Sequence, residues 1–383
     1  KEGWGIFFPE TLFWSEVRYN RHVLPKVERV LPKYPDLSEF LMVFYDERRQ
    51  LDAYLTKTDR KVLEQTHLLL PKIKFAELRS MLTDKSNSKK WWASLRLKKL
   101  WEGGTFHPRG KKNHPRLGLE LYIYLFPSDY KLTNLEQSYC TSLQSFRGVH
   151  VAFLTMPQNS FWWDNKPKDH QAYLITRQER YLNLSERLSR RTGDQWPKLV
   201  PNFNAETDAQ IQVLDYSDTQ RSFQPIDLKI LHELTRGFRI SDFIARAVDT
   251  SRRPTVSERM KYLEQERFFY LVPVFYGLGC PINYRLIAVS KEGIQVLQTV
   301  AANCPVAVLY QGLRESDYNP ILFAQVRIPQ NWHEAFKKVL RDLSRILTAK
   351  FFQYSLVSPQ SSHSFEPNLY GLWDRNTRKW YGE

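Results

Sequence analysis

Cysteine is scarce in this chain, which has three cysteines in 383 residues. Cys140, Cys280 and Cys304 are too few and too widely spaced for a disulfide framework or a zinc cluster. No apolar run is long enough to span a membrane, and the first residues lack the pattern of a signal peptide. These absences exclude a disulfide scaffold and a helical membrane protein, and they favour a cytoplasmic location.

Familiar catalytic motifs are also missing. The sequence has no G-x-G-x-x-G after a strand, no G-x-x-x-x-G-K-[ST], no H-E-x-x-H and no G-x-S-x-G. His107 and His114 flank a basic loop, where surface charge is their expected role, and His150 lies in an apolar segment typical of a satisfied core histidine. We therefore predict a protein that is not an enzyme and that holds no cofactor and no metal.

Acidic residues are outnumbered by basic ones, 41 against 56, which gives a formal charge of +15 and a pI near 9.5. Such an excess favours contacts with nucleic-acid phosphates through counterion release. Two tryptophan pairs, Trp91-Trp92 and Trp162-Trp163, have two interpretations: stacking on bases or packing in a core. The charge indicates a nucleic-acid partner, although ribosomal and RNA-processing proteins share this balance.

Residues 226–276 predict three short helices followed by a β-hairpin. Helix one spans Asp227–Arg236, helix two begins at Ser241, and helix three buries Val256, Met260 and Leu263 at helical spacing. The aromatic run 268–276 then predicts the strand of a wing. The outward side chains of helix three suit base-edge and phosphate contacts; they are Arg252, Arg253, Thr255, Ser257, Arg259 and Lys261. Arg259 has a second interpretation, in which it braces the helix through a salt bridge. The pattern predicts a helix that enters a DNA groove, and the alternative is an ordinary three-helix segment with a basic face.

The next segment predicts strand, helix, strand, strand, helix, strand. The expected elements are strands at Tyr284–Ser290, Pro305–Leu313, Ile321–Pro329 and Lys350–Val357, with helices at Lys291–Ala302 and Trp332–Leu347. This order is that of a ferredoxin-like unit.

The same plan occurs earlier in the chain. Residues 55–106 predict a first winged unit, opened by Asp59, with a third helix that buries Ala93, Leu97 and Leu100. Its expected DNA contacts are Lys89, Lys90, Trp92, Arg96, Lys98 and Lys99, joined by Arg109, Lys111 and Lys112 of the basic loop. A second ferredoxin-like order follows, with strands near Leu119–Phe126, Val149–Leu154, Ala172–Arg177 and Ile211–Tyr216 and helices near Leu132–Leu143 and Arg180–Arg191.

The first residues continue this repeat. They predict the end of a wing and then strand Thr11–Tyr19, helix Val23–Leu31 and strands Phe40–Tyr45 and Leu51–Leu55. Two interpretations stay open, a partial ferredoxin-like unit whose DNA-binding unit precedes residue 1, and an ordinary N-terminal β-α-β addition.

At the residues of the second winged unit, the chain resembles the Lrp/AsnC (feast/famine) transcription regulators. The resemblance is carried by Asp227, Ile230-Leu231, Arg239-Ile240-Ser241, Ile244-Ala245, Ser251, Arg259-Met260 and Leu263-Glu264. Glu266-Arg267 replaces the glycine that usually follows the recognition helix. The resemblance implies an effector site at Gly312 and Asp317, between the second and third strands of the last domain, for a small molecule such as an amino acid.

We thus predict an α+β protein with repeated winged helix-turn-helix units alternating with ferredoxin-like βαββαβ domains. The expected domains are 1–55 (partial ferredoxin-like), 56–116 (winged), 117–220 (ferredoxin-like), 221–278 (winged), 279–358 (ferredoxin-like) and 359–383 (C-terminal hairpin). The expected function is that of a sequence-specific regulator that binds double-stranded DNA, self-associates through its ferredoxin-like domains and binds no membrane. The alternatives are a non-enzymatic subunit of a nucleoprotein or transcription complex, and an enzyme like the sirohaem decarboxylases, which share the winged and ferredoxin-like plan.

Overall fold

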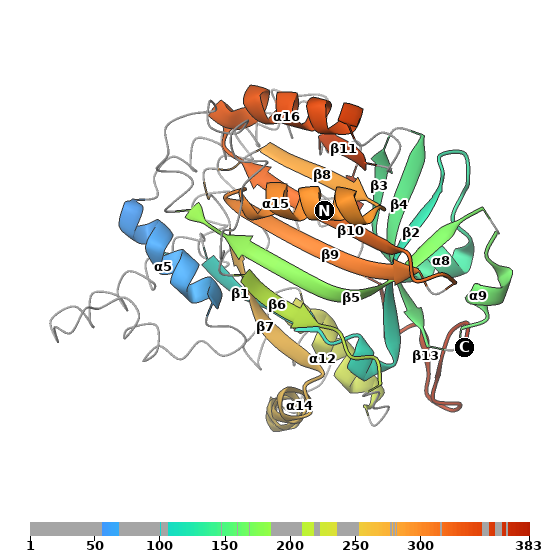
Figure 1. Ribbon diagram of the computed structural model, residues 1–383. Helices are drawn as coiled ribbons and strands as arrows, with labels where there is room; N and C mark the ends of the chain where they lie inside the picture. The colour runs from blue at the N-terminus through green and yellow to red at the C-terminus, as the bar shows by residue number, and fades with distance from the viewer. Residues whose placement is uncertain are drawn as a thin grey trace, which may run out of the picture. The chain divides into compact units, whose positions relative to one another are not determined.

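The structure is a computed structural model of the chain (Figure 1). It describes residues 56–68, 100, 106–184, 209–217, 223–235, 253–275, 278, 280, 282–346, 352–356, 362–364 and 367–383, with single gaps at 147, 159, 168 and 315. These residues group into two compact units: one is drawn from 1–111, 230–258 and 270–281, and the other from 112–229, 259–269 and 282–383. The predicted elements within 1–55, 69–99, 185–208 and 236–252 lie outside the described residues.

We call the unit drawn from 112–229, 259–269 and 282–383 the large unit. Its later part has the predicted order of strands and helices. Its elements are β8 (Ile282–Ala288), α15 (Lys291–Ala302), β9 (Val306–Arg314), β10 (Pro320–Ile328), the 3-10 helix η7 (Gln330–Trp332), α16 (His333–Ile346) and β11 (Phe352–Leu356). The strands lie side by side in the order β11-β8-β10-β9, and each neighbouring pair is antiparallel. The order β-α-β-β-α-β agrees with the expectation from hydrophobic periodicity.

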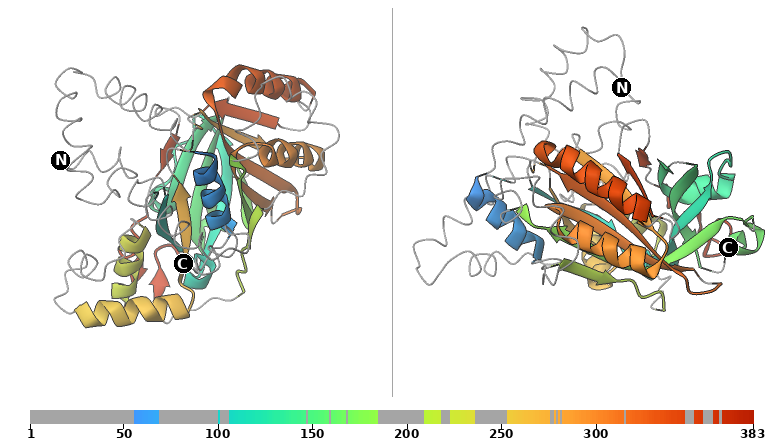
Figure 2. Two further views of the ribbon diagram at one scale, coloured as in Figure 1. Left: turned by 90° about the vertical axis from the view of Figure 1, so that its left-hand side faces the viewer. Right: turned by 45° about the horizontal axis from the view of Figure 1, so that its top comes forward.

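Helices α15 and α16 cover one face of these strands (Figures 1 and 2). The side chain of Ser290 caps α15 by accepting a hydrogen bond from the backbone N–H of Gly293 at 3.0 Å, as a helix N-cap does. Apolar residues then recur at helical spacing and pack against the sheet, including Leu297 on α15 and Phe336 and Leu340 on α16. Burial of these stripes holds both helices on the sheet.

The earlier part of the large unit differs from the expectation. Its elements are the 3-10 helix η5 (Pro115–Leu117), β2 (Leu119–Pro127), α8 (Asn134–Tyr139), β3 (Cys140–Phe146), β4 (Val149–Pro157), α9 (Trp162–Asn165), β5 (Gln171–Leu182) and β6 (Ala209–Val213). The helix predicted over Leu132–Leu143 ends at Tyr139, and β3 follows it directly. The helix predicted from Arg180 is also wrong at its start, because β5 continues to Leu182. The strand order here is β5-β2-β4-β3, and β6 pairs with β5.

One antiparallel sheet joins the two parts. Strand β5 pairs with β9 over most of its length, so ten strands of the described residues form a single curled sheet. One side of the later strands faces the two helices. On the other side, Ile123 and Val151 of the earlier part pack with Ile287 and Phe323 of the later part. We call this second side the inner face. The fold is mixed α+β, as predicted.

Within the two segments predicted as winged units, the described residues form three helices and two strands. They are α5 (Lys57–Leu68), β1 (Phe106–Lys112), α12 (Pro225–Thr235), α14 (Arg253–Gln265) and β7 (Phe269–Phe275). Strands β1 and β7 form a separate two-stranded sheet. Gly110 of β1 approaches Leu234 so closely that a Cβ would lie 3.0 Å from the Leu234 carbonyl oxygen, which explains the glycine. In α12 the predicted stripe of Ile230, Leu231 and Leu234 is buried.

The last described residues tie the chain end to the earlier part of the large unit. Strand β12 (Ser362–Ser364) pairs with β3, and β13 (Trp373–Asp374) pairs with β14 (Lys379–Trp380). Trp380 is 2% exposed, and its Nε1 donates to the carbonyl oxygen of Leu117 at 3.0 Å. Gly382 has a φ of 88° and a Cβ there would lie 2.6 Å from a methyl of Leu135, so the segment needs a glycine at this position.

The three cysteines are buried thiols that take no part in a disulfide. Burial raises the pKa of the Cys140 thiol to about 11. Within the described ranges, every helix is too short or too polar to cross a membrane.

Candidate functional site

A pocket of about 700 Å³ opens at the inner face of the large unit. Residues from both parts of the sheet line it, including Tyr173 of β5 and Val289, which follows β8. Its polar lining includes Asp169, Gln171, Ser290, Lys291, Arg314 and Asn319. Apolar walls with a few charged groups at the rim are the usual composition of a small-molecule site.

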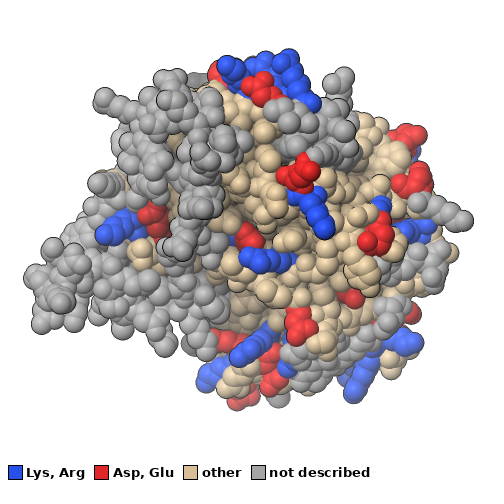
Figure 3. All heavy atoms as spheres, viewed as in Figure 1, with Lys and Arg blue, Asp and Glu red and all other residues tan. Residues whose placement is uncertain are grey.

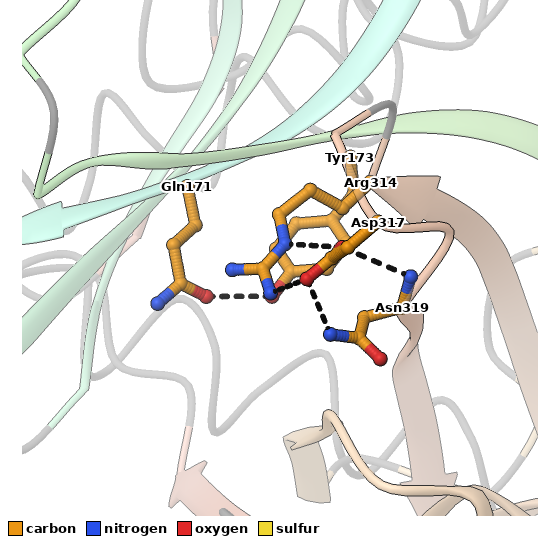
Figure 4. A network of polar contacts seen from close by, with 5 residues as sticks. All are labelled: Gln171, Tyr173, Arg314, Asp317 and Asn319. Atoms are coloured by element: carbon orange, nitrogen blue, oxygen red, sulfur yellow. Dashed lines mark hydrogen bonds and ion pairs between the residues drawn. The ribbon is translucent and has the colours of Figure 1, made fainter.

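A polar clasp shapes one side of this pocket (Figure 4). Arg314 ends β9, and its guanidinium forms two hydrogen bonds to the carboxylate of Asp317, one of them from Nε to Oδ1 at 2.8 Å. The same carboxylate accepts from the side-chain amide of Asn319 at 2.5 Å and from its backbone N–H at 3.1 Å. The Arg314 guanidinium also lies 5.9 Å from the ring centre of Tyr173. These bonds fix the loop between β9 and β10 and hold a cation at the pocket.

A second cation and a helix end lie on the same pocket. Lys291 is the first residue of α15, and Ser290 caps that helix. The N-terminal end of a helix favours negative charge because its first N–H groups point outward. Asp169 adds one negative charge to the lining. The pocket therefore presents charges of both signs to a ligand.

His170, next to Asp169, is held in the protein interior. Its Nδ1 lies 2.5 Å from the hydroxyl of Tyr124, and the ring of Tyr130 meets it edge-on at 4.3 Å. Burial also raises the pKa of the Tyr124 phenol well above its ordinary value. These contacts make His170 a packed residue that supports the pocket wall.

The two predicted effector residues lie in different settings. Asp317 is in the loop between β9 and β10, as expected. Gly312, however, lies inside β9, opposite Ile321 of β10 and Ile175 of β5. A Cβ at Gly312 would lie 3.0 Å from the carbonyl oxygen of Leu174 and 3.1 Å from Ile321 Cγ2. The expectation of a loop glycine is corrected: this glycine allows close packing of neighbouring strands.

The Asp317 carboxyl gives a pH prediction. Its hydrogen bonds from Arg314 lower its pKa from 3.8 to about 2. Because this pKa is depressed, the bonds contribute fully above pH 3.8 and are lost as the pH falls through about 2. We expect the carboxyl carbon of Asp317 to titrate by NMR near that value, and Arg314→Met to move the midpoint up towards 3.8. A midpoint unchanged by Arg314→Met would show that the clasp does not form in solution.

The predicted recognition helix is α14, and its Arg259 forms an ion pair with a buried carboxylate. Arg259 donates two hydrogen bonds to Asp227 of α12, whose carboxylate is 0% exposed, and one of them runs from Nε to Oδ1 at 2.8 Å. The Arg259 guanidinium lies 4.3 Å from the ring centre of Tyr262, and its pKa is raised, mainly by the bonds to Asp227. Arg259 therefore braces α14 against α12 and is not free to contact DNA.

The outward surface of the second half of α14 carries both signs of charge. Glu258, Lys261 and Glu264 are exposed, and Ser257 is half-buried. Arg253 and Thr255 belong to the helix, but their side chains and the whole of Arg252 lie outside the described residues. The expected face of short polar and cationic side chains is corrected for residues 257–264, because two exposed glutamates share it.

The other predicted DNA contacts are only partly described. Lys112 ends β1 and is 4% exposed, so we drop it from the expected phosphate contacts. Lys111 is half-buried, with its Nζ 5.7 Å from the ring centre of Tyr270. Arg109 lies in β1, but its side chain is outside the described residues, as are Lys89, Lys90, Trp92, Arg96, Lys98 and Lys99.

Two features of the structure have no counterpart among the predicted sites. Lys and Arg gather over α16 in Figure 3, where the exposed side chains are Lys337, Lys338, Arg341 and Arg345, beside Glu334 and Asp342. The other feature is Arg285, a buried cation on β8. A charged residue inside the apolar strand Tyr284–Ser290 was a signal that sequence reasoning could have used.

Trp162 and His150 have structural roles. Trp162 packs 5.3 Å from Tyr124, and its Nε1 donates to the buried carboxylate of Glu136 at 2.9 Å. His150 bonds through its two ring nitrogens to Ser145 Oγ and the carbonyl oxygen of Ser128, both at 3.1 Å. Of the two interpretations of the tryptophan pairs, core packing holds for Trp162.

Comparison with known proteins gives little. No protein-family model matches the chain, and no curated protein matches it significantly. One solved structure is similar: that of the siroheme decarboxylase NirDL in complex with an iron-uroporphyrin III analogue. The two chains are 13% identical, with a TM-score of 0.39 over 81% of this chain and 92% of the other.

The matched protein is an enzyme. This finding contradicts the sequence-based prediction that the chain is not an enzyme, and we withdraw that prediction. A likeness at this TM-score transfers no substrate, activity or site residue to the present chain.

Proposed function

We propose that this chain is a DNA-binding regulator related to the Lrp/AsnC family, with a small-molecule effector site in the pocket beside Arg314. The observation that carries the proposal is the ion pair between the buried Asp227 and the half-buried Arg259. Both residues stand at positions that carry the family resemblance, the first at the start of helix one and the second on the recognition helix. Their pairing explains why both residue types are needed there.

A parallel between the two predicted winged units supports the repeat. The carboxylate of Asp227 accepts a hydrogen bond from the backbone N–H of Gln224 at 2.6 Å. In α5 the carboxylate of Asp59 accepts from the backbone N–H of Thr56 at 3.0 Å, and the Thr56 hydroxyl accepts from the N–H of Asp59 at 3.2 Å. Each helix thus begins with an aspartate whose carboxylate accepts from the backbone N–H three residues earlier, and in α5 the Thr56 hydroxyl returns the bond as in a capping box.

The strand orders support the proposal of two ferredoxin-like halves. Numbered along the chain within each half, the strands β8, β9, β10 and β11 lie in the order 4-1-3-2, and so do β2, β3, β4 and β5. We propose these halves as the two ferredoxin-like domains, each following a winged unit in the chain.

Base contacts are proposed for the first half of α14. In helix-turn-helix proteins the N-terminal residues of the recognition helix reach the base edges. The second half of α14 carries Glu258 and Glu264, which phosphates repel. Arg252, Arg253, Thr255 and Ser257 are therefore the proposed reading residues, and Lys261 a phosphate contact.

The test is duplex binding by the Arg252→Ala/Arg253→Ala variant. Against a duplex selected from a random library, we expect a loss of about 1–3 kcal/mol per base contact, and a smaller loss on random DNA. The matched control is Lys337→Ala/Lys338→Ala, which removes two charges from α16. Fluorescence anisotropy at one fixed salt concentration measures both. Wild-type protein with no measurable affinity for any duplex would refute the proposal, and equal loss on both duplexes would limit the two arginines to phosphates.

The proposed effector is an amino acid or a similar zwitterion. Lys291 and the α15 N-terminus suit a carboxylate, and Asp169 suits an ammonium group. If the pocket is the effector site, an amino acid that binds wild-type protein should bind the Lys291→Met variant at least tenfold more weakly, as measured by calorimetry. Equal binding by the variant would move the effector site elsewhere.

A further inference from the structure

Arg285 lies on the inner face of the curled sheet. Side chains alternate along β8, and Tyr284 and Leu286 pack towards α15 and α16. Ile287 packs on the opposite side, in the cluster that both parts of the sheet share. Arg285 points to the same face as Ile287, because the two residues are two apart on the strand. Its cross-strand partner on β10 is Gln325. A full positive charge therefore sits on the face where the two parts of the sheet meet.

This guanidinium has no carboxylate partner among the described residues. Arg285 is 7% exposed, and its Nε and Nη1 are buried without an acceptor. Burial lowers its pKa to about 10, which still leaves it charged at neutral pH. On the same face, Asn283 Oδ1 is also buried without a donor. Buried charges in proteins are normally paired, because an unpaired one is costly.

The surroundings of Arg285 suit the body of an organic molecule. The nearby Tyr310 raises the pKa of Arg285 electrostatically. The ring of Tyr310 lies 5.0 Å from Phe153 and 6.3 Å from Phe323, and these two rings are 4.9 Å apart. Asn283 and Gln325 are only half-buried, so solvent reaches this end of the face. The group combines a cation, neighbouring aromatic rings and a partly exposed polar edge.

We infer that Arg285 anchors a second ligand site, on the inner face, for a molecule that carries a carboxylate on an apolar body. A planar carboxylate can take two parallel hydrogen bonds from the guanidinium, and the apolar body can contact the aromatic cluster. Val289, which lines the pocket of Arg314, is four residues further along the chain, just past the end of β8, or about 13 Å at the rise of a β-strand. The inferred site is thus distinct from the proposed effector pocket and independent of the proposed function.

The test compares binding and stability in one pair of variants. The probes are 2-naphthoate and its neutral analogue 2-naphthamide, measured by calorimetry and thermal unfolding. Wild-type protein should bind 2-naphthoate at least tenfold more tightly than 2-naphthamide. Arg285→Met should lose this preference, and Arg314→Met, which alters only the other pocket, should keep it.

The unfolding temperature distinguishes an arginine that binds a ligand from one that stabilises the fold. An unpaired buried charge destabilises the free protein, so Arg285→Met should unfold at a higher temperature than wild type when no ligand is present. Arg285→Lys, which keeps a charge without the planar fork, should bind 2-naphthoate more weakly than wild type. The inference is overturned by any of three results: no preference for 2-naphthoate in wild-type protein, the same preference in Arg285→Met, or an Arg285→Met variant that is less stable than wild type or fails to fold.

Discussion

Arg259→Met is expected to lower the free energy of unfolding by roughly 3–5 kcal/mol, the usual cost of removing one partner from a buried ion pair. The reason is the 0% exposure of Asp227: its carboxylate loses both hydrogen bonds from the guanidinium and cannot reach water. Urea unfolding followed by circular dichroism measures the change.

Two further variants make this result specific. Lys261→Met removes an exposed cation from the same helix, so its effect should stay within about 0.5 kcal/mol. The double variant Asp227→Asn/Arg259→Met should recover part of the loss, since the buried group is then neutral. A loss below about 1 kcal/mol in Arg259→Met would mean that the Gln224 N–H satisfies Asp227 without the guanidinium, and the main support for the proposed winged unit would be lost.

Trp380→Ala is expected to cost roughly 3–5 kcal/mol, as for other large-to-small changes at buried aromatic residues. The indole packs 4.8 Å from Trp373 and 5.7 Å from Phe223, and its N–H bonds to Leu117. The loss would therefore show how firmly the chain end is attached.

The neighbouring residue supplies the control for this prediction. Tyr381 is 55% exposed, so Tyr381→Ala should change stability by no more than about 0.5 kcal/mol. Trp380→Phe keeps most of the apolar contact but leaves the Leu117 carbonyl without its donor, at a cost of about 1–3 kcal/mol. Equal effects of Trp380→Ala and Tyr381→Ala would contradict the packed position of the indole.

Strong local signals predicted the elements that the structure confirms. The helix at Lys291–Ala302 has the predicted bounds, because its apolar residues repeat at helical spacing; Ser290, which we predicted as the last residue of the preceding strand, is its N-cap. The strands β8, β9 and β10 were each predicted within two residues at either end. Patterns of this kind depend on neighbours along the chain and can be read without knowledge of the fold.

The missed strand β3 shows where this approach fails. Leu135, Tyr139 and Leu143 are spaced as on one face of a helix, and Thr133 with Glu136 forms the capping box that starts α8. Beyond Tyr139, pairing with β4 overrides the helical pattern, and Gly148, with a φ of 78°, makes the turn between the two strands. The glycine was a turn signal in the sequence, but the pairing itself depends on tertiary contacts.

The candidate site was less predictable than the fold. Asp317 was predicted from the resemblance and bonds to Arg314 beside the pocket, whereas Lys291 and Arg314 line the pocket only because β8, α15 and β9 meet there. Arg285 was visible in the sequence as a charge inside an apolar strand, but only the structure shows which face of β8 it occupies and that its buried nitrogens Nε and Nη1 have no acceptor among the described residues. Sequence patterns indicate burial, but they do not show which side chains lack a partner.

The pairing of β5 with β9 places both parts of the sheet in one polypeptide. In an assembly of identical subunits, every substitution appears in each copy, so a charge introduced at one place must be tolerated at its symmetry mate as well. Here Ile123 of β2, which faces Phe153 across the strands, has the place in the earlier part that Ile287 has opposite Phe323 in the later part. Because both parts belong to one polypeptide, a substitution at Ile123 does not impose the same substitution at Ile287. The inner side chains of the two parts can therefore evolve separately, one set becoming polar while the other stays apolar.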